Sequence, residues 1–248
     1  MMSLHTRGSR SRFLQVVAAA LSGVLAAADG HATQEKEGKT LMEEQKTIIV
    51  IGASYAGGWN SDSPIAGFRL INKGVGGQQS FEMRARFQTD VIALKPHAVI
   101  IWGFINDVFR SDRDRIEHTL KQTQENLAAM VQAAKMADIR PILATEVTVR
   151  GKDEWRETVG GWIGRLLGKP NYHDYVNGHV VRINRWIRET AVREGVLLLD
   201  FEVALSDDRG IRRKEFAQPD GSHISQRGYE VLSQMTEARL QSSEALRQ

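Results

Sequence analysis

The stretch that decides the fold is residues 47–58, TIIVIGASYAGG. The apolar and β-branched run 47–51 predicts a buried strand, and small residues with a glycine pair follow it. A turn after a strand ordinarily favours Asn, Asp or Pro, whereas this chain has Ser54 between small residues. Ser54 is therefore either a helix cap or a nucleophile presented at the end of a strand.

Similar apolar runs recur along the chain and alternate with helical patterns. Strands are predicted at 47–51, 68–71, 98–102, 141–145 and 196–199, and amphipathic helices at 80–93, 114–137, 180–194 and 225–240. Continuous β-branched or leucine runs are typical of parallel strands that are covered on both faces. The alternation predicts an α/β protein, a three-layer α/β/α sandwich with a parallel sheet of about five strands.

The N-terminal region has a different composition from the rest. Arg7, Arg10 and Arg12 precede an apolar stretch at 13–28, and small residues follow it. This order is typical of a secretory signal peptide. An N-terminal membrane anchor is the alternative, but the stretch is Ala-rich and shorter than the roughly 20 residues that a spanning helix needs.

We therefore expect a signal peptide at 1–32, a polar linker at 33–45 and one domain at 46–248. Cleavage after Ala28 or Ala32 fits the small residues there. The mature protein is expected to be exported, in a periplasm or outside the cell, without stable membrane insertion. Residues 151–178, rich in glycine and aromatic residues, interrupt the alternation and are either a lid over the site or a surface insertion.

Charge and cysteine content exclude several classes of function. The chain has 33 Lys and Arg against 30 Asp and Glu; without residues 1–32, which hold three Arg and one Asp, these become 30 and 29. A nearly neutral protein gives no reason to expect a nucleic-acid partner. The absence of cysteine excludes a thiolate nucleophile, a cysteine metal site and a lipid-modified cysteine.

Polar and small residues follow the predicted strands, where ligands of parallel sheets bind. They occur at 52–54, at 72–77, at 103–107 and, before the last helix, at 220–223. Each has a structural explanation when taken singly: a cap at Ser54, a positive-φ turn at Gly76 and Gly77, turn chemistry at Asn106, a surface histidine at 223. These single explanations leave their joint occurrence at one edge of the sheet unexplained.

The same residue types suit acyl transfer. A serine hydroxyl is a weak nucleophile and needs an adjacent base. His223 can supply the base, and Asp220, three residues earlier, can orient the imidazole. The developing oxyanion needs preorganised donors, which a glycine-turn amide and the Asn106 side chain can provide.

These four blocks, Ser54, Gly77, Asn106 and Asp220-x-x-His223, resemble those of the SGNH (GDSL-type) hydrolase superfamily over about residues 46–243. The resemblance implies a flavodoxin-like sandwich and ester or thioester hydrolysis. It implies that Ser54 is the nucleophile and that Ser54, Gly77 and Asn106 form the oxyanion hole. Gly76 is the alternative to Gly77.

Two positions depart from the family pattern. Ala53 precedes the serine where the family usually has Asp, so the acidic neighbour is absent. Phe104 and Ile105 separate Gly103 from Asn106, one residue more than usual, which makes the Asn106 assignment less direct.

Other motifs do not support a cofactor or a metal. GASYAGG lacks the lysine of a phosphate-binding loop, and GVGGQQ lacks the third glycine of a dinucleotide fingerprint. His173, Asp174 and His179 show no recognisable metal-ligand spacing and are interpreted as polar surface. We expect no cofactor and no metal.

The sequence thus predicts a serine hydrolase that cleaves short-acyl or carbohydrate O-acetyl esters through an acyl-enzyme. A lysophospholipase or lipase-like esterase, a thioesterase, an O-acyltransferase and a non-catalytic carbohydrate-binding module are the alternatives. Trp59, Trp155 and Trp162 could stack on sugar rings or line an acyl pocket, unless they pack in the core.

Overall fold

Five parallel strands form the centre of the computed structural model, which describes residues 46–59, 64–150 and 172–243. Their order in the sheet is β2-β1-β3-β4-β5. The strands are β1 (Thr47–Gly52), β2 (Arg69–Gly74), β3 (Ala98–Trp102), β4 (Arg140–Ala144) and β5 (Leu197–Leu199). The predicted parallel sheet of about five strands is confirmed.

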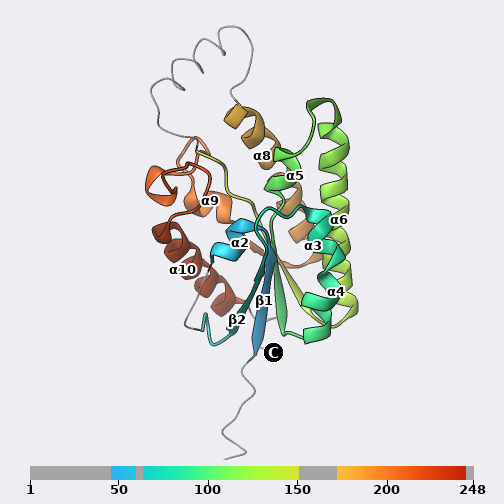
Figure 1. Ribbon diagram of the computed structural model, residues 1–248. Helices are drawn as coiled ribbons and strands as arrows, with labels where there is room; N and C mark the ends of the chain where they lie inside the picture. Colours follow the sequence, from blue (N-terminus) through green and yellow to red (C-terminus); the bar gives the residue numbers. More distant parts are fainter. Residues whose placement is uncertain (1–45, 60–63, 151–171, 244–248) are drawn as a thin grey trace, which may run out of the picture. The chain divides into compact units, whose positions relative to one another are not determined.

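Helices cover both faces of this sheet (Figure 1). The longer ones are α6 (Ile116–Met136), α8 (Tyr172–Glu194) and α10 (Gln226–Ser242), and the shorter ones are α2 (Ser54–Gly58), α3 (Ser80–Ala85), α4 (Phe87–Asp90), α5 (Ile105–Phe109) and α9 (Phe201–Leu205). Figure 1 shows α3, α4 and α6 on one side of the sheet and α10 on the other. Within the described ranges, no helix is long and apolar enough to span a bilayer.

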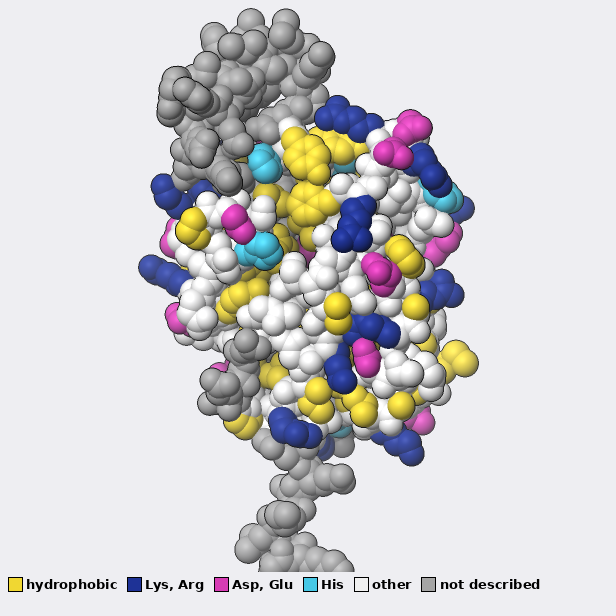
Figure 2. Space-filling view, viewed as in Figure 1, with side chains coloured by type: hydrophobic (Ala, Val, Ile, Leu, Met, Phe, Trp, Pro, Cys, Tyr) yellow, Lys and Arg dark blue, Asp and Glu magenta, His cyan; other side chains and the backbone are white. Residues whose placement is uncertain are grey.

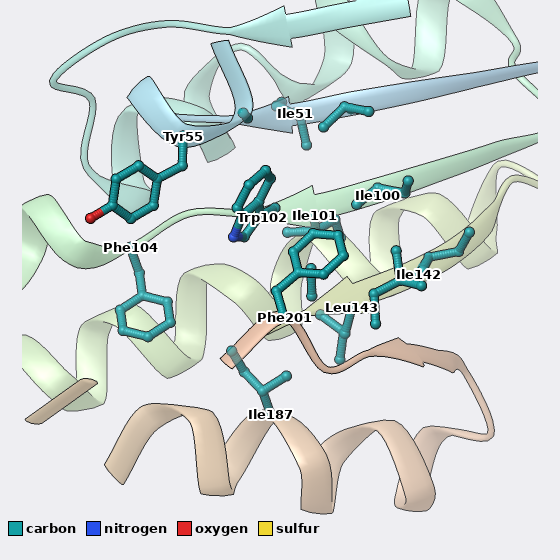
Figure 3. Packing of buried hydrophobic residues seen from close by; sticks show 14 of the residues in the cluster. Ile51, Tyr55, Ile100, Ile101, Trp102, Phe104, Ile142, Leu143, Ile187 and Phe201 are labelled. Atoms are coloured by element: carbon teal, nitrogen blue, oxygen red, sulfur yellow. The ribbon is translucent and has the colours of Figure 1, made fainter. Parts of the chain in front are cut away.

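The core lies where the central strands meet the helices. Residues 48–51 of β1 are at most 1% exposed, as expected for a parallel strand covered on both faces. At the end of β3, aromatic rings pack edge to face, with 4.7 Å between the ring centroids of Trp102 and Phe201. Figure 3 shows these rings between the strands and α8. This packing supports the edge of the sheet at which the candidate residues lie.

The predicted helix at 80–93 is wrong in its continuity. The structure has α3, then α4 and a 3₁₀ turn at Ile92–Leu94, with a break at Arg86. Arg86 has φ −97° and ψ 3°, and its guanidinium donates to the carbonyl of Gly52 (3.1 Å) and to Gln78 Oε1 (2.7 Å). The break thus brings a cation to the end of β1.

Two further boundaries differ from the expectation. β2 extends to Gly74, so Asn72 lies inside the strand and not after it. Residues 172–178, predicted to be part of an insertion, form the first turns of α8. The remainder of that insertion, 151–171, lies outside the described residues, as do the predicted signal peptide and linker.

Candidate active site

Ser54 is the first residue of α2, directly beyond the end of β1. The N-cap of this helix is Ala53, and no side chain caps the helix with a hydrogen bond at that position. The interpretation of Ser54 as a helix cap is therefore wrong. As the first residue of a helix, Ser54 also has a backbone N–H without an intrahelical acceptor, and its side chain is partly exposed.

Two features of the structure hold α2 against the sheet. A Cβ on Gly52 would lie 2.0 Å from the Trp102 carbonyl oxygen, so only glycine fits where β1 ends. Asn72 Nδ2 donates to the carbonyls of Ala56 (2.7 Å) and Trp59 (2.9 Å) at the other end of α2. Ser54 is thereby held on a short helix that is tied at both ends.

The loop after β2 is tied to the helix after β3. Gly77 has φ +78°, a conformation that favours glycine. Asn106 Nδ2 donates one N–H to the carbonyl of Gln78 (2.9 Å), which leaves its second N–H for another acceptor. Gly77 and Asn106 therefore lie on segments that are bonded to each other.

Asp107 is buried next to Asn106, and its hydrogen bonds hold the same loop on the interior side. Its carboxylate accepts from Ser80 N (2.8 Å), Ser80 Oγ (2.5 Å) and Thr123 Oγ1 (3.0 Å). Burial raises the pKa of Asp107, while these hydrogen bonds oppose the rise. The three bonds connect the start of α3 with α5 and α6, and so fix the position of Asn106.

Asp220 and His223 are in contact in the turn before α10. His223 Nδ1 lies 2.5 Å from Asp220 Oδ2, while Asp220 Oδ1 accepts from the backbone N–H groups of Ser222 (2.8 Å) and His223 (2.9 Å). Partial burial acts to raise the pKa of Asp220, but these hydrogen bonds outweigh it and lower the pKa to about 2. Asp220 is therefore ionised at neutral pH.

Tyr55 connects this turn to α2. Its hydroxyl donates to the carbonyl of Ser222 (2.6 Å), and its ring stands edge-on to the His223 ring at 6.4 Å between centroids. Tyr229 on α10 donates to the Tyr55 carbonyl (2.9 Å). Burial raises the pKa of Tyr55 to about 12, so its phenol keeps its proton for the hydrogen bond to Ser222.

The structure thus brings two pairs of predicted residues together: Asp220 with His223, and the Gly77 loop with Asn106. Ser54 precedes Tyr55, which contacts the histidine turn; among the described residues no hydrogen bond joins Ser54 Oγ to His223. Catalytic hydrogen bonds are often long without substrate. The side chains of His223 and Asp220 are 50% and 44% exposed. Figure 2 shows a histidine and an acidic side chain close together on the surface of this face.

A polar cavity of about 450 Å³ lies beside the Gly77 loop, between α3, α5 and α6. We call it the α3–α6 cavity; its lining includes Gln79, Phe81, Arg84, Arg110, Gln122 and Asn126. Phe81 is 55% exposed. A guanidinium nitrogen of Arg110 lies 3.2 Å from where a Cβ on Gly77 would be, so the cavity adjoins the candidate oxyanion glycine.

A substrate-stacking role for Trp59 does not fit the structure. Trp59 is 3% exposed, and its Nε1 donates to Ser233 Oγ (2.9 Å), so it packs in the core and does not stack on a substrate. Trp155 and Trp162 lie outside the described residues. His173, Asp174 and His179 belong to α8, and within the described chain no group of three or more acidic or histidine side chains could hold a metal ion.

The sequence reasoning missed Tyr55, Asn72 and Asp107. The available signal for Asn72 was its position directly after the predicted strand 68–71, where an amide can bond to neighbouring carbonyls. The role of Tyr55 has no local signal, because its partner lies 167 residues away.

Comparison with known proteins gives a family match over most of the described domain. Residues 51–231 match the GDSL-like lipase/acylhydrolase family. An uncharacterized lipoprotein, YqeF, of Bacillus subtilis is 21% identical over 169 residues, which cover 66% of this chain and 70% of YqeF. An acetylxylan esterase of Geobacillus stearothermophilus is 47% identical over 47 residues, 19% of this chain and 22% of that enzyme.

Solved structures have the same fold. A GDSL-like lipase from Bacteroides thetaiotaomicron superposes with a TM-score of 0.61 at 20% identity, covering 86% of this chain and 98% of the lipase. A catalytic mutant of Axe2, an acetylxylan esterase from Geobacillus stearothermophilus, superposes with a TM-score of 0.58 at 18% identity, covering 79% and 94%.

Proposed function

The chain belongs to the GDSL-like lipase/acylhydrolase family, and we propose that it is a serine esterase in which Ser54, His223 and Asp220 carry the reaction. The observation that supports this most is the contact between Asp220 Oδ2 and His223 Nδ1. Because Nδ1 is engaged by an ionised carboxylate, Nε2 is left as the proton acceptor of the imidazole.

In the proposed mechanism, Ser54 Oγ attacks the carbonyl carbon of the ester while His223 Nε2 takes the serine proton. The tetrahedral intermediate collapses, and the leaving alcohol takes that proton from His223. A water molecule then attacks the acyl-enzyme with His223 again as base, and the acid is released as Ser54 regains its proton. Asp220 holds the imidazole in the required tautomer throughout.

The proposed oxyanion hole consists of the backbone N–H groups of Ser54 and Gly77 and the side-chain amide of Asn106. The Ser54 N–H has no intrahelical acceptor, and Asn106 has a second N–H beyond the one that Gln78 accepts. All three are uncharged donors fixed by the fold, as preorganised stabilisation of a developing oxyanion requires.

We further propose that the substrate is an O-acetyl ester of a carbohydrate. The support is the α3–α6 cavity, whose amide and guanidinium side chains suit the hydroxyl groups of a sugar, while the exposed ring of Phe81 suits a sugar face. The partial match to an acetylxylan esterase points in the same direction.

The function is tested by steady-state hydrolysis of p-nitrophenyl acetate, butyrate, octanoate and palmitate and by acetate release from O-acetylated xylo-oligosaccharides. Ser54→Ala is the control. We expect Ser54-dependent turnover that is highest on acetyl esters. Phe81→Ala should raise KM for the acetylated oligosaccharide several-fold and leave that for p-nitrophenyl acetate unchanged, whereas Met136→Ala, a change at an exposed residue of α6, should alter neither.

Three other outcomes would each favour a different function. A preference for octanoate or palmitate would indicate a lipase-like esterase. Transfer of acetyl to an added sugar in competition with water would indicate an acyltransferase. Absence of turnover on every ester, in the wild type and Ser54→Ala alike, would contradict an esterase and favour a carbohydrate-binding module.

For residues 1–32 we propose a signal peptide, on the basis of the three arginines and the apolar stretch that follows them. N-terminal sequencing of the protein from the medium or periplasm of an expressing cell tests this. A first residue near 29 or 33 is expected; an intact N-terminus in the cytosol would contradict export.

A further inference from the structure

Two fully buried charged side chains lie near the candidate active site. Arg212 is 0% exposed and Glu146 is 1% exposed. Burial of a charge costs free energy unless the group is paired and hydrogen-bonded. In the described part of the chain, Glu146 Oε1 and the Nε and Nη1 atoms of Arg212 have no hydrogen-bond partner. Packing alone therefore does not explain why Arg212 and Glu146 are buried at these positions.

Arg212 bonds to the turn that carries His223. Its Nη2 donates to the carbonyls of Gly221 (3.0 Å) and Ser222 (2.7 Å), the two residues between Asp220 and His223. The side chains of Asp220 and His223 are about half exposed, so the turn is held mainly through its backbone, where the Gly221 carbonyl also accepts from the Arg150 N–H (3.1 Å). Arg212, together with Tyr55, which bonds to the same Ser222 carbonyl, tethers the turn from the protein interior.

Glu146 bonds to the segment that leads to Asn106. Its Oε2 accepts from the backbone N–H groups of Phe104 (2.9 Å) and Ile105 (3.4 Å). The backbone of Glu146 is itself fixed by Asn184, which accepts from the Glu146 N–H (2.8 Å) and donates to its carbonyl (2.7 Å). Glu146 thus presents a fixed acceptor at the N-terminal end of α5.

We propose that Arg212 and Glu146 are positioning residues that hold His223 and Asn106, respectively, in their reactive places. The proposal rests on the proposed esterase function. The guanidinium is also close enough to the carboxylate to oppose the rise in the pKa of Glu146 that burial causes. Each of the two buried side chains thus bonds to the backbone of one candidate catalytic segment.

Arg212→Met tests the proposal that Arg212 positions His223, since methionine keeps an apolar stem and removes the guanidinium N–H donors. A misplacement of about 1 Å can cost on the order of 10²-fold in rate, so we expect kcat to fall at least about 30-fold with KM within about threefold. Arg212→Lys, which keeps one cationic donor, should recover part of this loss. Arg213→Met is the matched control, because Arg213 is the exposed neighbour, and it should leave kcat unchanged.

A double-mutant cycle separates positioning from general loss of structure. If Arg212 acts through His223, Arg212→Met should cause no further loss in a His223→Ala background, measured on the residual hydrolysis of p-nitrophenyl acetate. Glu146→Ala should likewise cause no further loss in an Asn106→Ala background. Glu146→Gln, which keeps an acceptor for the Phe104 N–H, should restore most of the rate.

The outcomes are distinct. Losses that multiply in both cycles, or unchanged kcat in Arg212→Met and Glu146→Ala, would overturn the proposal. Where Arg212→Met does not fold by circular dichroism, Arg212→Lys and the Glu146 cycle decide. A wild type without Ser54-dependent hydrolysis overturns the esterase function and this inference together, whereas Ser54-dependent hydrolysis with a normal Arg212→Met overturns the inference alone.

Discussion

At the scale of the residue, the polar side chains of the candidate site divide their atoms between the local fold and the proposed chemistry. Asp220 uses one carboxylate oxygen to order the backbone of its turn and the other to contact His223 Nδ1. Asn106 uses one N–H to bind the Gln78 carbonyl and keeps the other. The same side chains therefore stabilise the local fold and supply the proposed chemistry. Because the proposed chemistry acts on the transition state, their substitution should lower kcat more than it changes KM.

Asn106→Ala should lower kcat by about 10²–10³-fold with little change in KM, because it removes one proposed oxyanion donor. Steady-state kinetics on p-nitrophenyl acetate measures this. Gln241→Ala, on the outer surface of α10, is the control. A large rise in KM with normal kcat in Asn106→Ala would instead indicate a role in ground-state binding.

Glu146 should make the stability of the protein depend on pH. Burial raises the pKa of Glu146 from 4.5 to about 7. The folded state therefore binds more protons than the unfolded state between these values, and the free energy of unfolding falls as pH rises from about 4.5 to about 7. The loss attributable to this group is ~3 kcal/mol at most.

Urea unfolding of the wild type and Glu146→Gln at pH 5 and pH 8 tests this. The variant lacks the titrating group, so its stability relative to the wild type should rise between the two pH values. An identical pH dependence in both proteins would show that Glu146 titrates normally.

At the scale of the element, the loop between β2 and α3 has two adjacent glycines with different constraints. Gly77 has φ +78° and lies against Arg110. A Cβ on Gly76 would meet nothing within 4 Å. The two glycines that the sequence offers as alternative oxyanion donors therefore differ in backbone conformation and in the space around them.

Gly77→Ala should reduce kcat by tenfold or more and destabilise the protein by about 1 kcal/mol, since alanine at positive φ is strained. Gly76→Ala should be close to wild type in both respects. Steady-state kinetics and thermal unfolding measure the two effects. The reverse order of effects would move the proposed donor to Gly76.

At the scale of the whole molecule, continuous apolar runs between helical patterns predict the parallel sheet. The runs at 47–51 and 98–102 fall on β1 and β3, which are almost fully buried, because a parallel strand covered on both faces needs continuous apolar sequence. Short helices such as α2, α5 and α9 have five residues each and no periodic pattern to detect. No residue within 80–93 signals the break at Arg86, whose guanidinium bonds to the carbonyl of Gly52, 34 residues away.

The site residues likewise divide into those with a local sequence signal and those that depend on distant contacts. Ser54, Gly77, Asn106, Asp220 and His223 could be proposed because each follows a strand or precedes a helix in a short motif. Arg212 lies in a strongly charged stretch, DDRGIRRK, that resembles exposed surface, and only the fold shows that it is buried. Tyr55 and Glu146 likewise depend on partners far away in the sequence.

Residues 46–248 contain the five described strands and the candidate site, and they form a unit separate from residues 1–45. A chain that begins at Lys46 should therefore have the same melting temperature and the same kcat as one that begins at residue 33. Differential scanning calorimetry and ester hydrolysis on both chains measure this. A lower melting temperature of the shorter chain would show that residues 33–45 contribute to the fold.

The central claim, that Ser54 is the nucleophile, is tested most directly by mapping the adduct of a fluorophosphonate. The protein is treated with the reagent, digested, and the modified peptide is sequenced by mass spectrometry. We predict one adduct on Ser54, formed as hydrolysis is lost, and no labelling of Ser54→Ala. An adduct on another residue, or full inhibition with Ser54 unmodified, would contradict the assignment.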